Sequence, residues 1–319
     1  MNKNIVFFGT PEFAVSILDE LYTQNYNIIS VYTQTDKPKG RGNKVQMPPV
    51  KEYALSHDIP VYQPKTLRDE TVISKIREMK PDLIVVAAYG KIFPKELLDI
   101  PPYGCINVHG SLLPKYRGAA PVQRSIINGE KETGVTIMRM DEGCDTGSMI
   151  AKAEIKIPDD MNCGELFEKM GEVGSKLLTD TLPSIFDNTA VYEKQDEGKA
   201  TYSPKIEKSE LMLDFNRPVK ELHDLIRGVY PYLVCGCYQN TDKGKKGLRI
   251  AKAEPLSYAG EAKPGTVVLA DAKENKLIVA CGDGALNIIE LIPEGKQKMK
   301  SADYIRGRQI AAGDMLGLE

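Results

Sequence analysis

The residues best suited to do chemistry are an asparagine and a histidine two positions apart at the end of a short apolar run. The run 105–108 has the composition of a β-strand and delivers Asn107 and His109 to the start of a turn-rich loop. In an extended strand, side chains two positions apart project to the same side. An amide donor and an imidazole that titrates near neutrality can therefore converge on one small volume. Such a pair suits a carbonyl group whose oxygen becomes negative during attack.

A carboxylate that can complete this set lies in a second loop. Asp145 falls in the segment 141–147, in which two glycines permit tight turns. Asparagine, histidine and aspartate together form a set that can hold an oxyanion and move a proton. The alternative from these residues is a thiol hydrolase, in which Cys144 would be the nucleophile and His109 its base, with Asn107 as the third member.

Composition and charge restrict the class of protein. The 319 residues are enough for two domains, and 42% apolar and 27% charged residues are typical of a globular protein. A net charge of -2 gives no overall basic signal, so any contact with nucleic acid must be local. The six cysteines are scattered, and only Cys235 and Cys237 lie close together in sequence. No second pair and no nearby histidine completes a metal-binding pattern, so free thiols in a reducing compartment are expected. This cysteine pattern predicts a protein without a metal. Because neither a signal peptide nor a membrane-spanning run is found, the sequence also predicts a cytoplasmic location.

Short apolar runs alternate with amphipathic stretches through the first half of the chain. Buried strands are predicted at 5–8, 28–32, 83–88 and 105–108, and helices at 12–21 and 69–79. Thr10 is the expected N-cap of the first helix, with Pro11 at its first position. The alternation predicts an α/β fold with a doubly wound, mostly parallel sheet, a variant of the Rossmann fold. Ligands bind at the carboxyl ends of such strands, but no dinucleotide or phosphate-loop motif is present.

The second half of the chain carries different patterns. A long helix is predicted over 163–186, and the polar stretch after it has no clear period and is typical of a linker. A helix begun by Asn216 and Pro218 comes next, followed by short alternating runs that suit a small β-barrel. These runs are 266–270, 276–280 and 285–291. The expected division is a catalytic domain over 1–189, a linker over 190–208 and a smaller domain over 209–319.

Several motifs, in the same order, resemble the formyltetrahydrofolate-dependent formyltransferases. They are the segments 6–13, 107–121, 133–138, 145–147 and 200–206. The resemblance runs nearly end to end and is greatest to the branch of the family that acts on methionyl-tRNA. It implies transfer of the formyl group of 10-formyltetrahydrofolate to the α-amine of initiator methionyl-tRNA, by direct attack without a covalent enzyme intermediate. It makes Asn107, His109 and Asp145 the catalytic residues and the C-terminal domain an OB-like, tRNA-binding barrel.

The same resemblance implies binding residues and partners. Those expected at the reduced folate are Ser111, Leu112, Leu113, Pro114 and Tyr89, the last beside a slot for the pterin ring. The basic loop 33–51 would engage the acceptor arm of the tRNA, and the residues expected there are Lys37, Lys39, Arg41 and Lys44. No membrane and no obligate protein partner are expected, and a monomer is the default.

Other activities share the same catalytic residues. A formyltetrahydrofolate hydrolase or a sugar formyltransferase would use the same trio. Their acceptors, water and a sugar, would not require the basic loop 33–51. A tRNA-binding module with a lost active site is disfavoured by the intact trio. The chain also lacks the tryptophans that the family often carries, and Phe215 and Tyr232 take their positions. Both are expected to keep aromatic packing in a repacked barrel.

Overall fold

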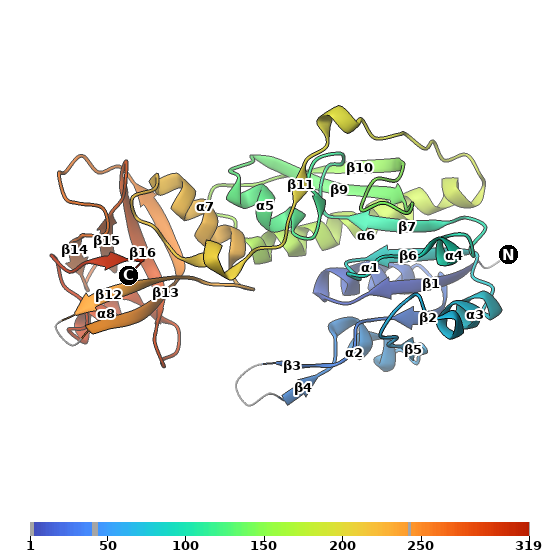
Figure 1. Ribbon diagram of the computed structural model, residues 1–319, viewed down its shortest axis with the longest axis horizontal. Helices are drawn as coiled ribbons and strands as arrows, with labels where there is room; N and C mark the ends of the chain where they lie inside the picture. The colour runs from blue at the N-terminus through green and yellow to red at the C-terminus, as the bar shows by residue number, and fades with distance from the viewer. Residues whose placement is uncertain (1–2, 40–43, 242–243, 319) are drawn as a thin grey trace. The chain divides into compact units, whose positions relative to one another are not determined.

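The computed structural model describes residues 3–39, 44–241 and 244–318. Contacts divide the chain into two compact units. The first comprises Met1–Pro121, Glu132–Lys156 and Phe167–Pro204, and the second comprises Val122–Lys131, Ile157–Leu166 and Lys205–Glu319. Figure 1 shows helices and sheet strands in the first and a curled sheet in the second.

The first unit is built on a sheet with the strand order β10-β9-β7-β6-β1-β2-β5. The parallel strands are β1 (Asn4–Gly9), β2 (Asn27–Tyr32), β5 (Val61–Tyr62), β6 (Leu83–Ala87) and β7 (Cys105–His109). Two antiparallel strands, β9 (Glu132–Arg139) and β10 (Met149–Lys156), extend the sheet beyond β7. Every residue of β6 is buried, as expected for a central strand covered on both faces. The predicted Rossmann-like, mostly parallel sheet is confirmed.

Helices cover both faces of this sheet. They are α1 (Glu12–Thr23), α2 (Pro49–Ser56), α3 (Glu70–Glu78), α4 (Lys95–Leu98) and most of α6 (Cys163–Phe186). Helix α5 (Pro121–Ile127) belongs, apart from its first residue, to the second unit. Gly174 of α6 lies against Val108, whereas Cys105, on the other face of β7, shares a core cluster with Ile76 of α3 and Leu97 of α4. Asn107 and His109 therefore project from the face of β7 that carries α3 and α4.

The first helix begins differently from the prediction. Its N-cap is Pro11 rather than Thr10, and no side chain caps its first turn. The hydroxyl oxygen of Thr10 instead accepts a hydrogen bond from the backbone N–H of Gln34 at 3.4 Å. The predicted cap was wrong because a neighbouring segment of the chain uses this oxygen, a contact that local sequence does not reveal.

The second unit contains an antiparallel sheet in the order β14-β15-β16-β13-β12-β18, with β17 paired to β16. Its strands are β12 (Cys235–Thr241), β13 (Gly244–Leu256), β14 (Val267–Asp271), β15 (Lys276–Ala280), β16 (Ala285–Pro293), β17 (Met299–Lys300) and β18 (Leu316–Gly317), and its helices include α7 (Val219–Val229) and α8 (Ser301–Arg306). Register shifts in β13 bend the sheet. A bridge between Thr266 and Met315 brings the outer strands together. The predicted small barrel is thereby confirmed.

The two aromatic residues at the family's tryptophan positions differ in their surroundings. Phe215 is buried, as expected, but Tyr232 is 55% exposed. Tyr232 precedes the first strand of the barrel and keeps part of its ring accessible, so its aromatic packing stays a prediction.

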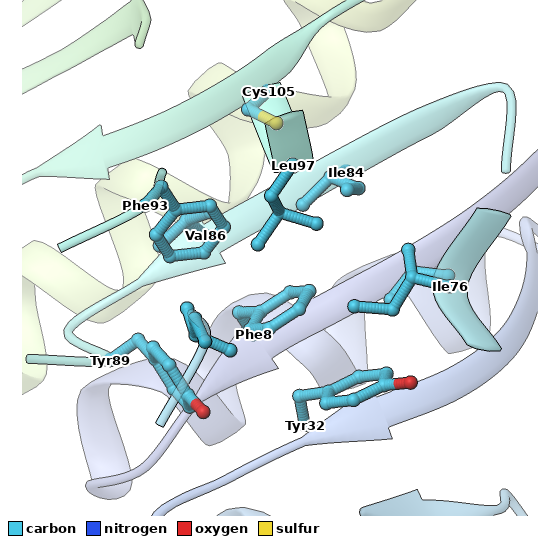
Figure 2. Packing of buried hydrophobic residues seen from close by; sticks show 11 residues of the cluster. Phe8, Tyr32, Ile76, Ile84, Val86, Tyr89, Phe93, Leu97 and Cys105 are labelled. Carbon is cyan, nitrogen blue, oxygen red and sulfur yellow. The ribbon is translucent and has the colours of Figure 1, made fainter. Parts of the chain in front are cut away.

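An aromatic cluster forms the core beside β1. Phe8 stacks on Tyr32 with ring centroids 4.6 Å apart and meets Tyr89 and Phe93 edge-on, each at 5.0 Å (Figure 2). All four side chains are buried. We expect Phe8→Ala to lower the free energy of unfolding by about 3–5 kcal/mol, because it leaves a cavity and removes apolar burial. Urea denaturation measures this loss. Phe8→Leu should cost clearly less, and equal costs would contradict tight packing around the ring.

No helix within the described ranges is long and apolar enough to cross a lipid bilayer.

Candidate active site

Strand β7 presents the predicted pair at its carboxyl end. Its pairing with β6 on one side and β9 on the other fixes its backbone. His109 is the last residue of the strand and is only 6% exposed, while Asn107 is half-buried. The two side chains share a face because they are two residues apart.

Asp145 reaches this pair from the loop between β9 and β10. Its carboxylate Oδ2 lies 3.7 Å from His109 Nδ1, and its Oδ1 lies 3.5 Å from Asn107 Nδ2. The backbone N–H of Gly118 donates to Oδ2 at 2.8 Å and fixes the carboxylate. The structure thus brings together the three residues that the sequence singled out, from two separate segments.

The backbone around Asp145 has an unusual conformation. Asp145 has a φ of 56°, in the left-handed region that aspartate tolerates better than most residues. Two residues on, a Cβ at Gly147 would lie 1.8 Å from the carbonyl oxygen of Arg139, so only glycine fits. The glycine expected to allow a turn is therefore required by a close approach of two backbones.

Both nitrogens of the His109 ring face oxygen acceptors. Nε2 lies 3.0 Å from the carbonyl oxygen of Tyr116, to which it can donate, and Nδ1 faces Asp145. The 3.7 Å between Nδ1 and the carboxylate is longer than a hydrogen bond, so the Tyr116 carbonyl is the partner that orients the ring. The geometry places an imidazole beside a carboxylate and an amide, a set that can stabilise a developing oxyanion.

Cys144 lacks the features of an activated nucleophile. Its thiol is exposed, with Sγ 3.8 Å from Asp145 Oδ2. Partial burial and the neighbouring Asp145 carboxylate raise the pKa of the Cys144 thiol. An activated thiol needs the opposite shift, and the nitrogens of His109 are directed at other partners. The thiol-hydrolase alternative is therefore disfavoured.

Comparison with known proteins identifies the family. A family model described as formyl transferase matches residues 3–182, and one for the formyl transferase C-terminal domain matches residues 205–309. The chain belongs to the formyl transferase family. A methionyl-tRNA formyltransferase of Ruminiclostridium cellulolyticum is 46% identical over 315 residues, which cover 98% of this chain and 99% of that protein. One from Bacillus subtilis is 46% identical over 314 residues, covering 98% of each.

Solved structures share the fold of this formyl transferase. WlaRD, a sugar 3N-formyl transferase, has a TM-score of 0.65 at 21% identity, covering 93% of this chain and all of its own. HypX from Aquifex aeolicus, solved in complex with tetrahydrofolic acid, has a TM-score of 0.62 at 16% identity, covering 96% of this chain and 47% of its own. At these identities the likeness establishes the fold alone.

The loop predicted to contact folate is a well-supported scaffold. Ser111 is fully buried, and its Oγ donates to the carbonyl of Lys115 at 2.6 Å. Leu113 is also buried and packs with Met138 and Met149. Of the four loop residues predicted to bind folate, only Leu112 and Pro114 keep part of their side chains accessible. The folate assignment of this loop stays a prediction.

Tyr89 lies in the core cluster rather than at an open surface. Its side chain is 2% exposed, and its hydroxyl has no hydrogen-bond partner among the described residues. Burial raises the pKa of Tyr89 to about 12, so the hydroxyl stays protonated. The backbone carbonyl accepts from Gln34 Nε2 at 2.8 Å. Tyr89 would therefore contribute to a pterin slot by packing beneath the neighbouring residues, not by contacting the ring with its own side chain.

The basic loop forms a hairpin. Strands β3 (Lys37–Lys39) and β4 (Lys44–Gln46) pair antiparallel, with Lys39 opposite Lys44. Arg41 lies outside the described residues. At the base of the loop, Lys51 is paired with Asp36 at 2.7 Å, and its hydrogen bond lowers the pKa of that carboxyl. Lys51 is thus used internally, whereas Lys37 is exposed.

The sequence analysis missed two side chains that support the trio. Gln195 and Arg117 are buried beside the loops that carry Asp145 and follow His109. Arg117 lay inside a recognised motif without an assigned role, and Gln195 lay in the stretch predicted as a linker. No local signal distinguished Gln195, because its partners are 48 and 50 residues away.

Among the described residues, no group of histidine, cysteine, aspartate and glutamate could hold a metal ion.

Proposed function

We propose that this protein transfers the formyl group of 10-formyltetrahydrofolate to the α-amine of initiator methionyl-tRNA. The observation that carries the chemistry is the convergence of Asn107, His109 and Asp145 at the end of β7. The acceptor is supported by relatives named methionyl-tRNA formyltransferase, which match this chain over almost its full length.

The acceptor amine needs little activation. An ordinary α-amine has a pKa near ~7.7, and esterification of the carboxyl group lowers it further. Much of the amine is therefore the free base at neutral pH, and no covalent relay through the enzyme is needed. The amine nitrogen forms a bond to the formyl carbon, the bond to N10 then breaks, and the proton lost by the amine ends on N10.

The trio acts on the tetrahedral intermediate between these steps. The Asn107 amide donates to the formyl oxygen, and His109, as the imidazolium, stabilises the negative charge that develops there. Asp145 holds His109 in its charged form and guides a water-mediated proton transfer towards the departing nitrogen. The Gly118 N–H keeps the carboxylate oriented for both tasks.

We assign the tasks along the chain as follows. Residues 1–189 carry folate binding and catalysis, 190–208 link the domains, and the barrel over 209–319 binds tRNA together with the hairpin at 37–46. Lysines and arginines of the barrel, including Lys245 and Arg249 of β13, supply local positive charge despite the net charge of -2. We place this activity in the cytoplasm, where initiator tRNA is aminoacylated and used.

Formyl transfer measured with three acceptors tests this function. With labelled 10-formyltetrahydrofolate, we expect formyl-methionyl-tRNA to form far faster than either formylmethionine from free methionine or formate from water, because tRNA contacts position the amine. Formate release at the same rate without tRNA would identify a hydrolase. Transfer only to an amino sugar would identify a sugar formyltransferase.

A further inference from the structure

The segment 195–203, here called the strap, contacts both loops of the active site. It lies between the two regions matched by the family models, which end at residue 182 and resume at residue 205. It belongs to the first unit and contains a short 3-10 helix, Glu197–Lys199, and the strand β11 (Tyr202–Ser203). The strap therefore does more than connect two domains.

One end of the strap holds the loop that follows His109. Strand β11 pairs in parallel with β8 (Arg117–Gly118). The hydroxyl oxygen of Thr201 accepts from the N–H of Tyr116 at 2.8 Å, and Ser203 Oγ donates to the Tyr116 carbonyl at 3.1 Å. This carbonyl is the one that faces His109 Nε2. The strap thus fixes the acceptor that orients the imidazole.

The other end holds the loop that carries Asp145. Gln195 Nε2 donates to the carbonyl oxygens of Asp145 and Gly147, both at 2.8 Å. The Gln195 side chain is 3% exposed, whereas residues 141–144 of the loop are exposed. Two hydrogen bonds from one buried amide therefore hold the part of the loop that follows its exposed residues 141–144.

A buried arginine, paired with the exposed side chain of Glu197, holds Gln195 in place. Arg117 is 0% exposed, and its Nε donates to Gln195 Oε1 at 3.0 Å. Its two terminal nitrogens donate to Glu197 at 2.9 and 2.8 Å, the bidentate geometry that suits a buried guanidinium. These hydrogen bonds lower the pKa of Glu197, which keeps the pair ionised at neutral pH. Arg117 is thus committed to internal partners.

We propose that Gln195, locked by the Arg117–Glu197 pair, is a positioning residue for formyl transfer. By holding the backbone of Asp145 in its left-handed conformation, it keeps the carboxylate within reach of His109 and Asn107. This inference rests on the proposed function, since it concerns the same trio. A displacement of about 1 Å at a reacting group can cost ~10²-fold in rate, so the strap has a direct effect on kcat.

Gln195→Glu tests this role with little change of shape. It keeps an oxygen for Arg117 Nε but sets a second oxygen against the carbonyls of Asp145 and Gly147. We expect kcat to fall by about tenfold, with both KM values within about twofold, since positioning is lost and binding is not. The same substitution at exposed Gln24 is the control and should leave kcat unchanged. An unchanged kcat in Gln195→Glu would overturn the inference.

A double-mutant cycle separates positioning from general loosening. If Gln195 acts through Asp145, then Gln195→Glu should have almost no further effect on kcat in an Asp145→Asn background. An equal loss in both backgrounds would mean a merely structural role and would overturn the inference. Glu197→Gln removes the charge of the pair with Arg117 while keeping the shape of the side chain, and it should lower kcat by a smaller factor. This variant replaces Gln195→Glu in the experiment if Gln195→Glu does not fold.

A thiol probe reports on the strap without requiring activity. Cys144 adjoins Asp145 and is exposed, whereas the other cysteines are buried. We expect Gln195→Glu to raise the rate of Cys144 alkylation by N-ethylmaleimide several-fold, because release of the loop lets the Asp145 carboxylate, which raises the pKa of the Cys144 thiol, move away from Sγ. An unchanged rate would contradict the strap. Failure of the wild-type protein to formylate methionyl-tRNA would instead contradict the proposed function, so the two failures are distinguishable.

Discussion

Replacing His109 by alanine should lower kcat for formyl transfer to methionyl-tRNA by roughly 10²–10³, the usual cost of losing one group that stabilises an oxyanion. The buried ring lies between the Tyr116 carbonyl and the Asp145 carboxylate. Its position is thus set before the reaction, so little reorganisation is needed. Because this interaction is made mainly in the transition state, KM for folate and for tRNA should change little. Steady-state kinetics with purified methionyl-tRNA measures the effect.

The chain provides a matched control for this substitution. His57 stacks on Tyr53 with ring centroids 4.1 Å apart and has no contact with the trio among the described interactions. His57→Ala should therefore leave kcat within about twofold, as surface substitutions usually do. If folded His109→Ala retained the kcat of His57→Ala, His109 would have no part in the chemistry. Asn107→Ala should lower kcat to a similar extent, because the amide that donates to the formyl oxygen is lost.

The trio could be predicted from sequence because its geometry is largely local. The two-residue spacing of Asn107 and His109 fixes a common face once the run is a strand, and a buried apolar strand is a strong signal. Asp145 required the resemblance to a family, since spacing alone does not bring a distant loop to a strand end. The parallel sheet followed in the same way, from apolar runs separated by amphipathic helices.

Features that depend on distant partners were not predictable. Thr10 has the residue type of an N-cap, but a backbone N–H from another segment competes for its oxygen. Gln195 carries no periodic or compositional mark, and its role arises from carbonyls that only the folded chain brings to it. Tyr89 follows the end of a parallel strand, where ligand-binding residues are common, but its side chain packs in the aromatic core. In each case a tertiary contact outweighs a local preference.

Removing positive charge from the hairpin should strongly weaken the use of tRNA. We expect the triple variant Lys37→Ala, Lys39→Ala, Lys44→Ala to lower kcat/KM for methionyl-tRNA by about 10² near physiological salt, if each lysine neutralises one phosphate. At ~0.7–0.9 per contact, the slope of log affinity against log salt should become shallower by about 2–3. Folate binding should change much less than tRNA use, since none of the three lysines is among the residues predicted to contact folate. Arg41→Ala should act in the same direction.

The control for this variant removes the same charge elsewhere. Lys95, Lys169 and Lys176 are exposed, and their salt bridges within the described ranges are with acidic neighbours on their own helices or helix ends. Lys95 also lies in the electrostatic reach of Glu142. The triple alanine variant of these lysines changes the net charge by the same amount, so a general field effect would weaken tRNA use equally in both variants. Phosphate contact by the hairpin predicts a change of salt slope in the hairpin variant alone. Equal slopes in the two triple variants would contradict a hairpin that binds the acceptor arm and would leave the barrel as the source of tRNA affinity.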